Sequence, residues 1–87
     1  MTKAEIRRER ERLDRAFRYV QRRLGLSLDL TLEVSPDISL LSIGPTARGV
    51  EDPHAFVVGF NPDTVHALSL AELRQSALHE ILHAWQF

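Results

Sequence analysis

The segment from residue 69 to residue 87 constrains this chain most, because it places two histidines four residues apart on one predicted helix. Its sequence is SLAELRQSALHEILHAWQF, and it contains His79, Glu80 and His83 in the pattern H-E-x-x-H. Residues four apart on a helix lie about 40° round the axis and about 6 Å along it. Both imidazoles can therefore reach a single metal ion at about 2.0–2.1 Å, while Glu80 points to the side.

The rest of this segment is amphipathic, and its histidines fall opposite the apolar side. Ser69 and Glu72 form a capping box, which gives the helix a defined start. On a helical wheel, Glu72, Ser76 and His83 all lie within about 60° of His79. A surface helix with two incidental histidines is the alternative, although a chance match would not be expected to place both opposite the core. The residues on the apolar side are Leu70, Leu73, Ala77, Leu78, Ile81, Ala84 and Trp85.

Residues 1–25 predict a second helix, which could pack beside the helix predicted for residues 69–87. Thr2 and Glu5 form another capping box, and Gly25 stands where a glycine often ends a helix. Between these two ends, one apolar stripe repeats at helical spacing. The stripe consists of Ile6, Leu13, Phe17, Val20 and Leu24.

The remaining surface of this predicted helix is basic. Residues 1–24 hold nine Lys and Arg against four acids, although the net charge of the whole chain is −1. A solvated helix carrying ion pairs, such as Asp14 with Arg18, is the simpler interpretation. A nucleic-acid surface is the other interpretation, because arginines that share one face can meet successive phosphates. The candidate contacts are Arg8, Arg15, Arg18 and Arg22.

Residues 26–61 have the pattern of a small sheet. Leu28–Val34 alternates apolar and polar side chains, and Ile38–Ile43 and His54–Phe60 supply two further apolar runs. The turn at 35–37 favours an antiparallel hairpin of the first two strands. We therefore expect one α+β domain over residues 1–87, with both helices on one face of a three-stranded, mainly antiparallel sheet. We also expect the third strand, which precedes the last helix, to be the edge that lines the site.

Composition narrows the class of protein. The 87 residues include no cysteine, which excludes a disulfide framework and thiolate metal ligands and fits a reducing compartment. No apolar run approaches the roughly 18 residues of a membrane-spanning helix. The charged N-terminus also lacks the apolar centre of a signal peptide. We therefore expect a cytoplasmic protein that does not enter a membrane.

The order of one helix, three strands and an H-E-x-x-H helix resembles the upper half of a zincin metallopeptidase. The likeness is greatest to SprT-like (Spartan-type) domains, and the similar stretches are residues 32–36, 57–62 and 77–85. This resemblance implies Zn²⁺ bound by His79 and His83, and Glu80 acting as general base and acid in peptide-bond hydrolysis. It also implies a sheet edge that holds an extended peptide, and an association with DNA-linked substrates.

A catalytic zinc site of this kind needs a third protein ligand, and the side chains after His83 do not provide one. His54, Asp63 and His66 are the candidates upstream, and the carboxylate of Phe87 is another if the chain ends there. We expect either that the chain is cut short after the helix or that a second chain completes the site. The alternative to a peptidase is therefore a catalytically incomplete, zincin-like binding or structural subunit.

Overall fold

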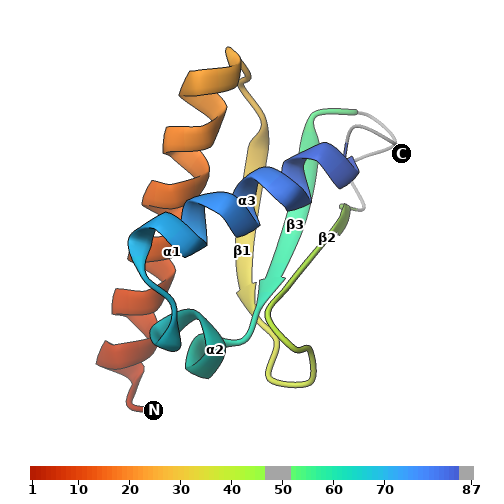
Figure 1. Cartoon of the computed structure of the whole chain (residues 1–87). Coiled ribbons are helices and arrows are strands. Elements are labelled where there is room, and N and C mark those ends of the chain that lie inside the picture. Colours follow the sequence, from red (N-terminus) through yellow and green to blue (C-terminus); the bar gives the residue numbers. More distant parts are fainter. Residues whose placement is uncertain (47–51, 85–87) are drawn as a thin grey trace.

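Helix α1, Lys3–Leu24, begins and ends where the capping signals predict. The computed structural model describes residues 1–46 and 52–84 of the chain (Figure 1). At the start of α1, the Thr2 backbone N–H donates to Glu5 Oε1 and the Glu5 N–H donates to Thr2 Oγ1, both at 3.1 Å. At its end, Gly25 adopts a left-handed backbone with φ of 69°, which closes the last turn without a Cβ clash.

The chain has the predicted α+β order, and most boundaries move by one or two residues. The second strand differs most, because it starts three residues later than predicted, and a short helix of six residues precedes the last helix. Pro62 is the first residue of that short helix, a position at which proline is common because its fixed φ suits the helix and no N–H is needed there. The last helix is described as far as Ala84, so the predicted extension to residue 87 lies outside the described residues. The remaining elements are β1 (Asp29–Val34), β2 (Leu41–Pro45), β3 (Ala55–Phe60), α2 (Pro62–Ala67) and α3 (Leu70–Ala84).

The sheet is mixed, and the predicted hairpin of the first two strands is wrong. The strand order is β1-β3-β2, with β1 parallel to β3 and β2 antiparallel to β3. The third strand is consequently the centre of the sheet, and the prediction that it forms the edge beside the site is also wrong. The edge that lies next to α3 is β2, as described below.

The reason for this order lies in the burial of β3 and in the length of the connection before β2. Phe56, Val58 and Phe60 are buried on one face of β3, which favours the position with a neighbour on each side. Residues 35–40 are longer than a tight hairpin turn and pass the end of β3. There the Ser35 N–H donates to the Phe60 carbonyl at 2.8 Å, and the Asn61 N–H donates to the Leu40 carbonyl at 2.9 Å.

Both helices contribute to a core on one face of the sheet. In Figure 1, α3 crosses in front of the strands, and α1 runs along the side of the sheet where β1 lies. The buried cluster joins Phe17 of α1 to Phe60 of β3 and Ile81 of α3. The predicted stripe of α1 is buried at Leu13, Phe17 and Val20, whereas Leu24 is 45% exposed. In the described part of the chain, no helix has the length and apolar character that a membrane crossing requires.

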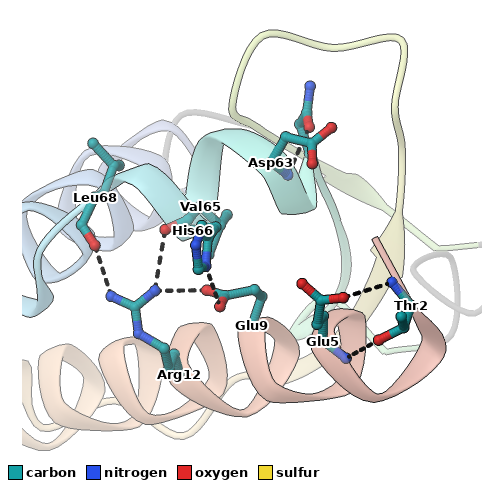
Figure 2. Close-up of polar contacts among 9 residues, drawn as sticks. Thr2, Glu5, Glu9, Arg12, Asp63, Val65, His66 and Leu68 are labelled. Carbon is teal, nitrogen blue, oxygen red and sulfur yellow. Dashed lines mark hydrogen bonds and ion pairs between the residues drawn. The ribbon is translucent and has the colours of Figure 1, made fainter.

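A buried carboxylate, which the sequence analysis did not identify, connects α1 to the segment before α3. Glu9 is 2% exposed, and its Oε2 accepts from Arg12 Nη1 at 2.6 Å, while its Oε1 lies 2.9 Å from His66 Nδ1 (Figure 2). Arg12 also donates to the carbonyls of Val65 and Leu68, at 3.3 and 2.6 Å. Burial raises the pKa of Glu9, but hydrogen bonds from His66 and Arg12 outweigh it and lower that pKa below its ordinary value.

We expect Glu9→Gln to lower the free energy of unfolding at pH 7 by about 2 kcal/mol, because it removes the charge that accepts these bonds. A lowered pKa stabilises the folded state above the pKa of an unfolded glutamate, about 4.3. This stabilisation is lost as the pH falls through the lower pKa of folded Glu9. Urea unfolding between pH 3 and pH 7 should therefore show the two proteins converging at low pH.

The matched control is Glu33→Gln, which changes an exposed carboxylate on β1. It should shift the free energy of unfolding by less than about 0.5 kcal/mol at every pH. A constant difference between Glu9→Gln and the unaltered chain from pH 3 to pH 7 would contradict the role assigned to the Glu9 charge.

Candidate metal centre

Helix α3 has a capped start and a buried side, which together fix the direction of its polar residues. The Ser69 N–H donates to Glu72 Oε1 at 3.0 Å, and the Glu72 N–H donates to Ser69 Oγ at 3.2 Å, as the capping box predicts. Burial then holds the opposite side of the helix against the sheet and α1. The buried residues are Leu73, Ala77, Ile81 and Ala84.

His79 and His83 lie side by side on the exposed face of α3. Their Nε2 atoms are 3.0 Å apart, and the ring centroids are 4.5 Å apart with the ring planes at 83°. Two nitrogens that each bind a tetrahedral zinc at 2.0–2.1 Å are about 3.3 Å apart. The observed distance is within a few tenths of an ångström of that value. The pair therefore fits two positions of a zinc site, and the same distance also allows a hydrogen bond between two neutral rings.

Glu80 lies beside this pair, in a groove between α3 and the edge of the sheet. We call it the α3–β2 groove, and its volume is about 480 Å³. Its sheet side is formed by Ser39, Leu40 and Leu41, at and just before the start of β2. Its helix side is formed by Leu68, Glu72, Gln75, Ser76, His79 and Glu80.

The groove brings together a carboxylate, a possible metal ligand and the start of an edge strand. Glu80 is half-buried, whereas both histidines are exposed. A carboxylate next to a metal can accept a proton from water, and an unpaired strand edge can hold an extended backbone. Such an edge is expected from the sequence, but the strand that provides it is β2 and not the predicted third strand.

The candidate third ligands do not join the histidine pair. His66 Nδ1 contacts Glu9 instead, and the Asp63 N–H donates to Asn61 Oδ1 at the start of α2. His54 borders a separate hollow formed by residues 25–28. In residues 1–46 and 52–84, no group of three or more His, Cys, Asp or Glu side chains is placed to hold a metal. The carboxylate of Phe87 lies outside the described residues.

The four candidate arginines are exposed on α1, and three of them share a hollow. Arg15, Arg18 and Arg22 border it together with residues 26–28. Arg8 is exposed closer to the start of α1 and does not border this hollow. The predicted pair of Arg18 with Asp14 is present, with Nε and Oδ2 2.9 Å apart. Three positive side chains therefore gather on one surface, although an acid already contacts one of them.

No protein-family model matches this sequence, and searches of curated proteins and of solved structures found no match either. The function is therefore inferred from the residues and their geometry.

We expect the chain to bind Zn²⁺, and His79→Ala or His83→Ala to weaken binding at least tenfold, because each removes a ligand nitrogen. Acidification should weaken binding in the unaltered chain, since protons compete for the imidazoles. Competition with a coloured zinc chelator measures both effects. His54→Ala, an exposed histidine away from the pair, is the control and should bind zinc like the unaltered chain. If the unaltered chain and all three histidine variants bound zinc with equal affinity, the histidine pair would not be the zinc site.

Proposed function

We propose that this chain is the upper half of a zincin-type zinc metallopeptidase, in which His79 and His83 bind Zn²⁺ and Glu80 is the general base. The observation that carries the proposal is the pair of exposed imidazole nitrogens 3.0 Å apart, next to Glu80 in the α3–β2 groove. Their arrangement supports two ligands and a base on one short stretch of α3. The strand edge beside Glu80 supports an extended peptide as the substrate.

Each group has a separate task in this proposal. Zinc held by His79 and His83 would polarise the peptide carbonyl and make water more acidic. Glu80 would accept the proton that the water gives up as its oxygen attacks the carbonyl carbon, and would deliver that proton to the amine nitrogen as the C–N bond breaks. The half-buried position of Glu80 suits this task, because the carboxylate is partly shielded from bulk water yet open to the groove. The buried side of α3 holds Glu80 and the histidines in a fixed relation.

The alternative proposal is a catalytically incomplete, zincin-like binding or structural subunit. The observation that favours it is that no third metal ligand joins the histidine pair within the described residues. Two protein ligands hold zinc more weakly than the three of a catalytic site. A second chain that supplied the third ligand would unite the two proposals, because the subunit would become active only in that complex.

We expect Glu80→Gln to lower peptide hydrolysis by about 10²–10⁴-fold, because the amide cannot accept the proton, while zinc still binds. The measurement pairs cleavage of a fluorescent peptide library with zinc content by elemental analysis. Glu11→Gln, an exposed change on α1, is the control and should cleave like the unaltered chain. Equal cleavage by Glu80→Gln would rule out the assigned base. Zinc binding without cleavage by the unaltered chain would favour the incomplete subunit.

Association with nucleic acid through α1 is compatible with either proposal, and the hollow shared by Arg15, Arg18 and Arg22 supports it. We expect a fluorescent DNA duplex to bind the chain, and Arg15→Gln with Arg22→Gln to weaken that binding by about tenfold at low salt. The slope of affinity against salt concentration should also become smaller, because fewer phosphates are neutralised. Arg7→Gln, an exposed control on α1, should change binding less. Binding that does not respond to salt would exclude this surface.

A further inference from the structure

The charge and shape of the α3–β2 groove point to the kind of segment that it binds. We propose that the groove binds an extended polypeptide that carries a lysine or arginine about three residues from the peptide bond held beside Glu80. This inference rests on the proposed peptidase function for the identity of that bond. The binding itself depends only on the groove.

The groove combines an apolar wall with acids. Leu40, Leu41 and Leu68 form apolar parts of its lining, while Glu72 and Glu80 are, besides His79, the only ionisable groups among its described lining residues. None of the lysines and arginines that the structure describes lines it. Arg74, the basic residue of α3, points elsewhere, because its guanidinium lies 3.8 Å from the centre of the Tyr19 ring on α1. The groove therefore favours a segment with one apolar and one cationic side chain.

Glu72 is the group that would meet the cation. Its Oε1 accepts from the Ser69 N–H at 3.0 Å, and the side chain is exposed at the mouth of the groove. The backbone hydrogen bond from Ser69, followed by the hydroxyl of Ser69, lowers the pKa of Glu72. The carboxylate consequently stays ionised at neutral pH. The capping bonds also fix its position along the groove.

The spacing on the helix determines the spacing on the bound peptide. Glu72 precedes His79 by seven residues, which corresponds to about 10 Å along a helix. An extended chain advances about 3.3 Å per residue, so three residues cover the same distance. Among the described residues no strand pairs with the outer edge of β2, so backbone groups there can pair with such a chain. A lysine three residues from a peptide bond held level with His79, beside Glu80, would thus lie next to Glu72.

The same groove is unsuited to nucleic acid. Phosphates that entered it would meet the carboxylates of Glu72 and Glu80, and no lysine or arginine in the described part of the chain. Arg15, Arg18 and Arg22 of α1 border a different hollow, and the two hollows share none of their described lining residues. A peptide is therefore the occupant that the charges favour.

The test measures binding separately from cleavage. Two fluorescent nine-residue peptides, identical except for lysine or methionine at one position, are titrated by anisotropy onto the zinc-loaded whole chain carrying Glu80→Gln. We expect the lysine peptide to bind about three- to fivefold tighter, as an exposed ion pair provides, and the difference to shrink at high salt. Adding Glu72→Gln should bring the two affinities together, since glutamine keeps the capping bond and loses the charge.

A second variant guards against a folding defect in Glu72→Gln. Gln75→Lys adds a cation to the groove and leaves the cap intact, so it should reverse the preference towards the methionine peptide. Equal binding of the two peptides by the Glu80→Gln chain, no binding of either, or a lysine preference that survives Glu72→Gln would each overturn the inference. Cleavage by the unaltered chain without a lysine preference would also overturn it, while the peptidase proposal would survive. A lysine preference without cleavage by the unaltered chain would support the inference about the groove and contradict the peptidase proposal.

Discussion

Burial of one side of α3 is the constraint on which the rest of the site depends. Leu73, Ala77 and Ile81 are inaccessible to solvent, so the helix cannot turn about its own axis without exposing them. With that rotation fixed, the two histidines are exposed and Glu80 lines the α3–β2 groove. The placement of the two imidazoles side by side on the exposed face is therefore a consequence of core packing and of their spacing on the helix.

The hydrogen bonds that Glu9 accepts, together with those that Arg12 donates, connect the segment just before α3 to α1. Arg12 of α1 donates to the carbonyl of Leu68, and Leu68 lines the α3–β2 groove just before α3 begins. One end of the groove is thus tied to α1 through a buried acid, its arginine and two backbone carbonyls. Burying Glu9 costs solvation energy, and the bonds from Arg12 and His66 offset that cost.

Local chemistry predicted the elements, whereas contacts distant in sequence decided their arrangement. The capping boxes at Thr2 and Ser69 and the glycine at position 25 fixed three helix ends, because each acts within a few residues. Alternation identified the strands but not their partners, so the turn at 35–37 suggested a hairpin that does not form. Glu9 had one detectable signal: it lies three residues after Ile6 and four before Leu13, within the apolar stripe. The spacing of H-E-x-x-H predicted the histidine pair, but a third ligand depends on placement in space.

The mixed sheet has a consequence for how the protein is made. In the described chain, both strand pairings include β3, so neither β1 nor β2 has a partner until residues 55–60 are available. During synthesis from the N-terminus, α1 and two apolar strands would leave the ribosome before β3, on which assembly of the sheet depends. The nascent chain therefore passes through a stage with exposed strand edges, when binding by a chaperone would be most useful.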